Sequence, residues 1–393
     1  MSDRFDVSVV GGGPAGATAA HELAKAGYAV ALLDKGGRIK PCGGAIPPRL
    51  MRDFDIPESL LCARIRSARM VSPSRRRVDM PIEGGFVGMV DREVFDEYLR
   101  ERAASAGAVR IRGAYERMSR DGGTGAIVHY RTREGLRSMR GRLVVGADGA
   151  TSKVARQEVN AKRPPCVFAY HEVLEAPDAS VRDYDGTRCD VIYQGTTSPD
   201  FYGWVFPHGS KVSVGTGSAM KGFSLKGSVA ALRDQTGLAE VRTVRREGAP
   251  IPMKPLKRWD NGRDVVLAGD AAGVVAPSSG EGIYYAMVGG DLAAVAAVSF
   301  LESGDARKLG LARKLFMKAH GRVFWILGIM QHFWYRNDKR RERFVSMCDD
   351  PDVQTLTWQA YMNKELVKAK PKAHARIFFK DMAHLLGIVS PTG

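Results

Sequence analysis

The first 34 residues contain two apolar runs with a helical pattern between them. The run that starts at Phe5 predicts a strand ending at Gly11, and a second run predicts a strand ending at Asp34. Residues 14–27 begin with proline, continue with alanine and leucine, and end with glycine, which is typical of a helix. This order predicts a strand–helix–strand unit.

The turn of this unit has the glycine spacing of a dinucleotide-binding motif. G-x-G-x-x-G permits a tight turn, and it lets a pyrophosphate approach the start of the helix, where amide groups and the helix dipole favour an anion. An acidic residue at the end of the second strand has the position expected of a ribose ligand and favours FAD or NAD. The candidate residues are Gly11, Gly13, Pro14, Ala15, Gly16, Asp34 and Lys35.

Two later segments repeat an apolar strand followed by an acidic turn. Residues 142–152 predict a strand before Asp148, and residues 264–283 predict a strand before Asp270 and a glycine-rich turn. An alanine- and valine-rich helix is then expected to about Glu302. Each segment alone is ordinary turn chemistry.

Residues 201–217 have the alternating pattern of a strand pair. The alternation places Tyr202, Trp204 and Phe206 on one face of a strand, where they are either the wall of an apolar groove or ordinary sheet core. Gly215-Thr216-Gly217 lacks the rest of a dinucleotide motif and is interpreted as a turn or bulge. A pyridine nucleotide would therefore bind only transiently, without a domain of its own.

The segment R-I-K-P-C-G-G-A-I-P-P at residues 38–48 predicts a shaped loop. Prolines restrict its backbone, and glycines allow another group to approach closely. Cys42 therefore lies where a bound molecule can come near its thiol.

Composition narrows the class of protein. The chain has 393 residues, of which 44% are apolar and 26% charged, as in a soluble globular protein of two or three subdomains. The net charge of +16 favours an anionic partner, and the arginines between residues 64 and 77 are either a binding patch or a solvated face. No nucleic-acid-binding signature accompanies this charge, so nucleic acid is not expected.

The five cysteines are scattered and form no C-x-x-C pair, which indicates a reducing compartment and neither a disulfide framework nor a metal site. The first strand leaves no room for a signal peptide, and the apolar run 323–335 is too short to span a bilayer. These features lead us to expect a bacterial cytoplasmic protein.

Taken in order, the three strand–turn segments resemble the para-hydroxybenzoate hydroxylase superfamily of flavoproteins. The resemblance implies tight, non-covalent FAD, with Asp148 in its cradle and Asp270 at its ribityl-diphosphate arm. It also implies that the amides of Gly282 and Ile283 lie beside the pyrimidine ring of the flavin, where a helix N-terminus favours the negative charge of the reduced ring. Arg92 matches an FAD-contacting arginine of the superfamily; the alternative is an exposed arginine at a helix start.

Two further motifs resemble the geranylgeranyl reductases of chlorophyll and bacteriochlorophyll synthesis. Y-x-W-x-F-P followed by G-x-G resembles their substrate-cavity motif, and K-P-C-G-G-A resembles their flavin-side cysteine loop. The similarity covers essentially the whole chain. It implies saturation of three double bonds of a geranylgeranyl chain, carried by a pigment or as geranylgeranyl diphosphate, with NADPH as the donor. The residues implied for the substrate are Tyr202, Trp204, Phe206, Pro207, Gly215 and Gly217, and those beside the flavin are Cys42, Gly43, Gly44 and Ala45.

The chemistry of alkene reduction suggests a role for Cys42. An isolated trisubstituted alkene is a poor hydride acceptor, so hydride addition needs a proton donor. A thiol is mostly protonated at neutral pH, and Cys42 can donate this proton or orient a donating water. The alternative is that Cys42 is a small packing residue.

The predicted fold class is α/β, or α+β overall. It combines a Rossmann-type FAD-binding domain of the para-hydroxybenzoate hydroxylase type, an antiparallel β-sheet substrate domain and a helical C-terminal region. The expected boundaries are 1–65, 91–160 and 255–305 for the FAD-binding domain, 66–90 and 161–254 for the substrate domain, and 306–393 for the helical region.

The helical region joins aromatic residues between 324 and 335 to arginines and lysines between 336 and 343. This segment either lies at a membrane interface or closes the substrate tunnel. The expected location is therefore the bacterial cytoplasm, with peripheral contact at the cytoplasmic face of a photosynthetic membrane as the open alternative.

Two other functions remain open from the sequence. An aromatic hydroxylase of the same superfamily would need a compact polar pocket with acid–base groups aimed at a phenol. A non-catalytic prenyl-binding module resembling Rab GDP-dissociation inhibitors would need no redox turnover.

Overall fold

The computed structural model describes residues 4–37, 40–122, 125–177 and 183–364, which group into two compact units. Unit 1 is formed by residues up to 40, 92–166 and 250–328, and unit 2 by 41–91, 167–249 and the residues from 329 onward. Residues 41–65, expected in the FAD-binding domain, group with unit 2, and the helical region is divided between the units. The part of that region beyond residue 364 lies outside the described residues.

Unit 1 contains a seven-stranded sheet with a parallel core and an antiparallel edge. In spatial order its strands are β8 (Val109–Arg112), β2 (Val30–Asp34), β1 (Arg4–Val10), β11 (Gly135–Gly146), β10 (Ala126–Thr132) and β9 (Ala114–Ser119), and β17 (Val265–Leu267) also pairs with β11. β1 runs parallel to β2 and β11, whereas β10 is antiparallel to β11 and β9. The predicted apolar strands are therefore the buried parallel core.

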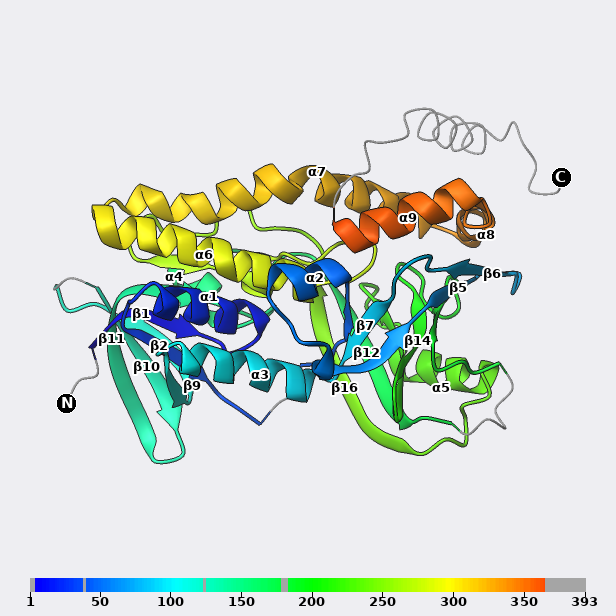
Figure 1. Cartoon of the computed structure of the whole chain (residues 1–393), viewed down its shortest axis with the longest axis horizontal. Coiled ribbons are helices and arrows are strands. Elements are labelled where there is room, and N and C mark those ends of the chain that lie inside the picture. The colour runs from blue at the N-terminus through cyan, green and yellow to red at the C-terminus, as the bar shows by residue number, and fades with distance from the viewer. Residues whose placement is uncertain (1–3, 38–39, 123–124, 178–182, 365–393) are drawn as a thin grey trace. The chain divides into compact units, whose positions relative to one another are not determined.

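Helices cover the sheet of unit 1. α1 (Pro14–Lys25) packs on α3 (Arg92–Ser105) and on α6 (Ile283–Ser303), which lies beside it in Figure 1. The approach of α6 is close, because a Cβ at Gly290 would lie 2.2 Å from the carbonyl oxygen of Ala15. The helices predicted from Pro14 and to about Glu302 are confirmed. Unit 1 also contains α4 (Lys153–Glu158), η2 (Gly269–Ala272), η3 (Ala306–Gly310) and the first part of α7 (Leu311–Trp334).

Within the described part of the chain, α6 is the one helix long and apolar enough to cross a membrane. Most of its residues are buried, and it packs on α1. Core helices of soluble proteins have the same length and composition, so this feature is weak evidence for a membrane span.

Unit 2 contains a larger and a smaller sheet. The larger sheet has the order β16 (Thr243–Pro252), β12 (Cys166–Glu175), β15 (Lys211–Ser218), β14 (Gly203–His208), β13 (Arg188–Ile192), β5 (Ser67–Val71) and β6 (Arg77–Pro81), and the smaller has the order β3 (Ala45–Ile46), β7 (Val87–Val90) and β4 (Leu61–Ile65). β13 and β5 are parallel, whereas the pairs from β12 to β13 and the pair β5–β6 are antiparallel, as predicted for this domain.

One face of the larger sheet forms a hydrophobic core with α5 (Leu225–Gln235). Val205 and Val214 of the sheet pack there with Leu232 of the helix. The remaining helical segments of unit 2 are α2 (Pro48–Asp53), η1 (Glu58–Leu60), α8 (Asp338–Met347) and α9 (Pro351–Asn363), with the end of α7.

The glycines of residues 215–217 lie inside a strand, so their interpretation as a turn or bulge is wrong. β15 pairs with β14 and β12 without a register shift through this segment. A Cβ at Gly215 would lie 2.2 Å from the indole of Trp204, and one at Gly217 would lie 2.7 Å from Val167. Glycine is needed because side chains of neighbouring strands fill the space.

Candidate active site

The glycine motif of unit 1 forms an open cradle at the start of α1. Gly11 has φ +108° and a Cβ there would lie 2.3 Å from Ala147, while a Cβ at Gly16 would lie 1.8 Å from the carbonyl oxygen of Gly11. A Cβ at Gly13 would meet nothing within 4 Å, so free space lies over the helix start. The first turn of α1 is formed by the buried residues Pro14, Ala15 and Gly16. This arrangement fits the close approach of a dinucleotide pyrophosphate.

The carboxylate of Asp34 is held beside this cradle. One of its oxygens accepts a hydrogen bond from the backbone N–H of Gly12 at 2.9 Å, and the other accepts one from Gly36 at 2.8 Å. Each oxygen keeps a lone pair for a ribose hydroxyl. Arg100, which sequence reasoning missed, donates to the carbonyl oxygen of Gly12 at 3.0 Å. Lys35 follows β2 with an exposed side chain, and its place in the site stays a prediction.

Asp270 lies at a second part of the cradle, in the short helix η2. Its side chain is 4% exposed and forms an ion pair with Lys40, the first residue of the K-P-C-G-G-A motif, to which the sequence assigned no role. One Asp270 oxygen lies 3.8 Å from the position of a Cβ on Gly282, the residue that precedes α6. Ile283 is the first residue of that helix, so the first amides of α6 lack intrahelical acceptors and can favour an anionic ring.

Asp148 and Arg92 have partners within unit 1. The carboxylate of Asp148 accepts hydrogen bonds from the backbone N–H groups of Lys153 and Val154 at 2.7 and 3.2 Å, and burial raises the pKa of Asp148. Arg92 is the first residue of α3 and donates twice to Asp96, at 2.8 Å each. Because Arg92 is only 5% exposed, its interpretation as an exposed arginine is wrong.

The cysteine loop is packed against two side chains of unit 2. A Cβ at Gly43 would lie 3.2 Å from the ring of Phe206, and Gly44 has φ +71° with a Cβ position 2.6 Å from Nε2 of His208. The thiol of Cys42 accepts a hydrogen bond from the N–H of Gly44 at 3.4 Å, and Ala45 begins β3. The glycines therefore make room for neighbouring side chains, and the contact of this loop with flavin stays a prediction.

His208 is a residue that sequence reasoning missed. Its Nδ1 lies 2.9 Å from the carbonyl oxygen of Phe206, so with the proton on Nδ1 the ring donates to it. Burial lowers the pKa of His208 to about 4, and the ring therefore stays neutral near pH 7.

Tyr202, Trp204 and Phe206 form a continuous aromatic row in unit 2. Ring centroids are 6.0 Å apart for the first pair and 6.2 Å for the second. Tyr202 and Trp204 are buried, and Phe206 is half-buried. Pro207 is also buried, but the strand alternation places it on the opposite face from the row, with Val205.

A buried hydrogen-bond relay holds the middle ring of this row. The indole N–H of Trp204 donates to Oγ of Ser213 at 3.1 Å, and this oxygen lies 2.8 Å from Nδ1 of His171. Nε2 of His171 lies 3.1 Å from a carboxylate oxygen of Glu247, whose other oxygen pairs with Arg245 at 2.6 Å. With the His171 proton on Nε2, the Trp204 N–H, the Ser213 hydroxyl and the His171 N–H each have an acceptor.

The comparisons with known proteins agree with this geometry. A family model described as an FAD binding domain matches residues 4–297. The chain is 58% identical over 390 residues to the geranylgeranyl diphosphate reductase of Rhodobacter capsulatus, covering 99% of both chains. It is 37% identical to the chloroplastic geranylgeranyl diphosphate reductase of Oryza sativa, covering 94% of this chain and 83% of that one.

A solved structure shows the same fold. This structure, of a geranylgeranyl bacteriochlorophyll reductase-like protein from Thermoplasma acidophilum, aligns with a TM-score of 0.81 at 24% identity, covering 94% of this chain and 99% of that one.

The fold and the glycine cradle define a flavoprotein that binds FAD through a Rossmann-type domain. Within that class, the chain belongs to the geranylgeranyl reductase family. The predicted fold class, the family and the cofactor FAD are thereby confirmed.

Proposed function

We propose that this protein is an FAD-dependent reductase that saturates three carbon–carbon double bonds of a geranylgeranyl chain to give a phytyl chain. The observation that carries this proposal is the 58% identity with the Rhodobacter capsulatus geranylgeranyl diphosphate reductase over 99% of both chains. The open space at Gly13 and the fixed carboxylate of Asp34 support it, because a redox enzyme of this kind needs a complete FAD cradle.

The residues of the chain have separate roles in this proposal. When bound and reduced by the electron donor, FAD would supply the hydride that adds to the alkene. Asp34 binds the ribose of the cofactor, and Asp270 orients its ribityl-diphosphate arm. Cys42 donates the proton that the alkene needs or orients a donating water. The aromatic row lines the path of the isoprenoid chain.

The electron donor in this proposal is NADPH, which binds transiently because the sequence has one complete dinucleotide motif. The geranylgeranyl chain is carried by a bacteriochlorophyll or chlorophyll pigment or as the free diphosphate.

The test is anaerobic incubation of the FAD-loaded protein and NADPH with geranylgeranyl diphosphate or with the geranylgeranyl pigment. Mass spectrometry is expected to show successive gains of two hydrogens, ending at the phytyl product. Oxygen incorporation into an aromatic substrate, with no change in the isoprenoid chain, would instead support an aromatic hydroxylase.

We also propose that the protein works at the cytoplasmic face of a membrane and contacts it through α7. The contact face carries Lys314, Lys318, Arg322, Trp325, Ile329 and His332, which recur at helical spacing and are all exposed. The Trp325 side chain is 67% exposed and that of Ile329 is 49% exposed. Residues 311–336 contain no acidic side chain. An exposed tryptophan flanked by cations suits an anionic lipid surface.

Vesicle binding tests this contact. The protein is expected to sediment with phosphatidylglycerol vesicles but not with phosphatidylcholine vesicles, and less at high salt. Replacing Trp325 and Ile329 by serine should weaken binding at least about tenfold, because both lose apolar burial. Val94→Ser is the matched control, since Val94 is 56% exposed on α3. Equal binding by the α7 variant and the control would contradict the proposal.

A further inference from the structure

A cavity in unit 1 gathers cationic side chains that no acidic residue balances. It is a shallow hollow open to solvent, with about 270 Å³ of space when the open solvent is included, and its lining includes Arg156, Lys162 and Arg163 but no carboxylate. Within the described part of the chain, none of these three side chains has a hydrogen bond or an ion pair. All three are exposed, so a ligand can reach them from solvent.

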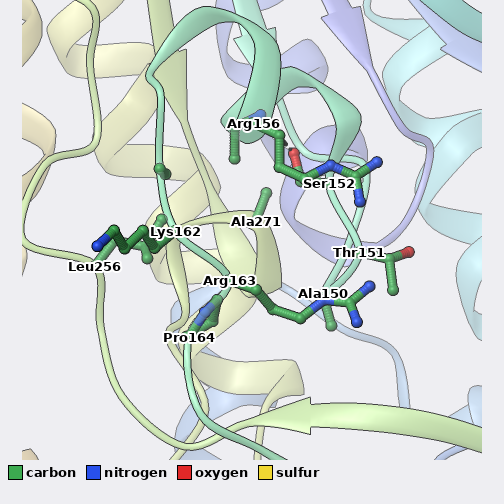
Figure 2. A pocket seen from close by; sticks show the side chains of 11 residues that line it. Ala150, Thr151, Ser152, Arg156, Lys162, Arg163, Pro164, Leu256 and Ala271 are labelled. Atoms are coloured by element: carbon green, nitrogen blue, oxygen red, sulfur yellow. Dashed lines mark hydrogen bonds between the residues drawn. The ribbon is translucent and has the colours of Figure 1, made fainter.

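The cations differ in where they point. Figure 2 shows the side chains of Arg156 and Arg163 extending to the same side of the cavity, where Thr151 lies, whereas Lys162 extends to the other side. Each guanidinium group on the Thr151 side can donate two hydrogen bonds to a phosphoryl group, which is the bidentate contact that arginine favours.

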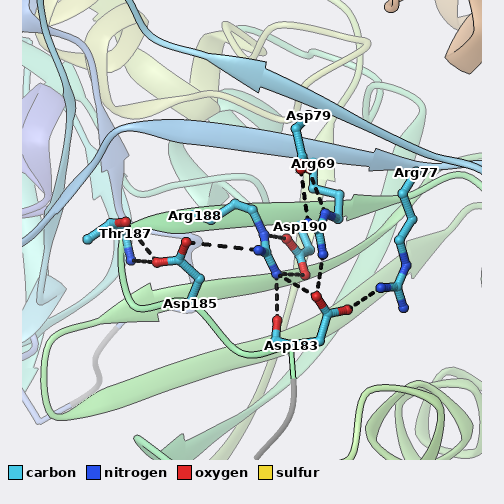
Figure 3. Close-up of polar contacts among 8 residues, drawn as sticks. All are labelled: Arg69, Arg77, Asp79, Asp183, Asp185, Thr187, Arg188 and Asp190. Atoms are coloured by element: carbon cyan, nitrogen blue, oxygen red, sulfur yellow. Dashed lines mark hydrogen bonds and ion pairs between the residues drawn. The ribbon is translucent and has the colours of Figure 1, made fainter. Parts of the chain in front are cut away.

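The arginines of the stretch at residues 64–77 differ from those of the cavity because several of them have carboxylate partners. Arg69 donates to Asp79 at 2.6 Å and to Asp183 at 2.5 Å, and Arg77 pairs with Asp183, as Figure 3 shows. The same network continues through Arg188, which donates to its neighbour Asp190 at 2.7 Å. Arg69, Arg77 and Arg188 therefore already have carboxylate partners in unit 2 and are less suited than Arg156 and Arg163 to bind an anion.

The cavity adjoins the FAD-binding segments without being the FAD cradle. Its lining residue Ala271 directly follows Asp270, and Ala150 follows the Asp148-Gly149 turn. None of the glycines at the start of α1 lines it, nor does Asp34. The glycine motif and Asp34, which are assigned to FAD, are therefore not part of the cavity lining, so the cavity is open to a second phosphorylated molecule.

We propose that Arg156, Arg163 and Thr151 bind the terminal phosphoryl group of a ligand that approaches the flavin. The identity of this ligand rests on the proposed function, whereas the phosphoryl site itself does not. Two ligands of the reaction carry such a group: the 2′-phosphate of NADPH and the diphosphate of geranylgeranyl diphosphate. Cationic side chains that are exposed to solvent suit a phosphoryl group that must bind and leave in every catalytic cycle.

The first experiment does not depend on turnover. Inorganic pyrophosphate is titrated into the FAD-loaded protein by calorimetry, using the wild type, the double variant Arg156→Gln/Arg163→Gln and the control Lys162→Gln. Removal of two charge-assisted contacts should weaken pyrophosphate binding about tenfold to a hundredfold. The control removes the same kind of charge from the same cavity and should bind as the wild type does. Unchanged binding in the double variant, or an equal loss in the control, overturns the site.

The second experiment identifies the ligand through the two half-reactions. Flavin reduction is measured anaerobically with NADPH and with NADH, and reoxidation of the chemically reduced protein is measured with geranylgeranyl diphosphate and with geranylgeraniol. A loss of affinity in the double variant for NADPH but not NADH assigns the 2′-phosphate, and a loss for the diphosphate but not the alcohol assigns the substrate. An equal loss for both members of each pair overturns the proposal. Absence of either half-reaction in the wild type would refute the proposed function and leave the pyrophosphate result standing.

Discussion

Gly44 and Gly215 each leave space for one specific ring in unit 2. Gly44 has φ +71°, and the imidazole of His208 lies 2.6 Å from the position that a Cβ would take there. Gly215 lies under the indole of Trp204. A side chain at either position would collide with a buried ring, and overpacking of this kind destabilises a fold. At the residue scale, the glycines therefore position the cysteine loop and the aromatic row.

Cys42→Ser tests the thiol as a proton donor. Serine can still accept the hydrogen bond from the N–H of Gly44, so the loop should keep its shape and FAD should stay bound. Serine is a much weaker acid, and a positioned acid contributes about a hundredfold to ten-thousandfold in rate. We expect stopped-flow reoxidation by the geranylgeranyl substrate to slow at least about tenfold, with flavin reduction unchanged.

Cys62→Ser is the control for this experiment, because burial raises the pKa of Cys62 to about 11 and its thiol donates to Met89. Unchanged reoxidation in Cys42→Ser would leave Cys42 as a packing residue. Loss of both half-reactions would indicate a misplaced flavin.

Because of His208, the free energy of unfolding should decrease as the pH falls. Its pKa is lowered to about 4 in the fold, mainly by burial and further by His171, whereas contacts with Phe206 and Gly43 and the charge of Asp91 act in the opposite direction. Between about pH 6.5 and 4 the unfolded chain binds a proton that the folded chain does not, so protonation favours unfolding. The loss from pH 7 to 5 is at most about 2 kcal/mol.

Denaturant midpoints at pH 7 and 5 measure this effect. Between pH 7 and 5 the denaturant midpoint should fall further in the wild type than in His208→Gln. His332 is exposed, so the midpoint of His332→Gln should fall as far as that of the wild type. Equal losses in wild type and His208→Gln would contradict the assignment.

At the scale of elements, β12, β14 and β15 together hold the aromatic row. Each strand alternates between the hydrophobic core with α5 and the opposite face, and the cross-strand pairs place His171, Trp204 and Gly215 side by side. The relay from Trp204 through Ser213 to His171 fixes the angle of the indole. A row held in this way can present a rigid apolar surface to an isoprenoid chain.

Trp204→Phe tests whether this row serves the substrate. The variant loses the indole N–H bond to Ser213 and part of the ring, which should cost about 1–3 kcal/mol of stability. Trp259→Phe is a matched control in unit 1, because Trp259 is fully buried and donates to Leu256 at 3.1 Å. We expect both variants to keep FAD but only Trp204→Phe to slow alkene reduction. Similar rates in the two variants would assign the row to the sheet core.

At the scale of the whole molecule, the FAD cradle combines segments that are far apart in the sequence. Asp34, Lys40 and Asp270 all belong to unit 1, although more than 200 residues separate the first from the last. Bound cofactor should therefore stabilise unit 1 by linking these segments.

Asp270→Ala should weaken FAD retention about tenfold or more, because the carboxylate that pairs with Lys40 is lost at the ribityl-diphosphate arm. The measurements are the FAD-to-protein ratio after gel filtration and the rise in melting temperature on adding FAD. Asp264→Ala is the control, since Asp264 is buried and paired with Arg120 in the same unit but lies outside the cradle. Unchanged FAD content in Asp270→Ala would contradict its assignment.

The sequence by itself determined the elements whose signals are local. Apolar periodicity and the glycine spacing around Gly13 predicted β1, α1 and β2, because strand burial, helix start and turn geometry depend on neighbouring residues. The alternation of Tyr202, Trp204 and Phe206 likewise predicted one aromatic face.

Only the tertiary structure decided the contacts made by distant segments. The need for glycine at position 215 comes from an indole on the next strand, so the local pattern suggested a turn instead. Lys40 beside Asp270 and His171 beside Ser213 have no signal in the sequence, because pairing across strands and loops leaves no fixed spacing. Two arginines of the stretch at residues 64–77 show the same limit. Their charge is visible in the sequence, but their pairing with Asp183 is made only by the fold.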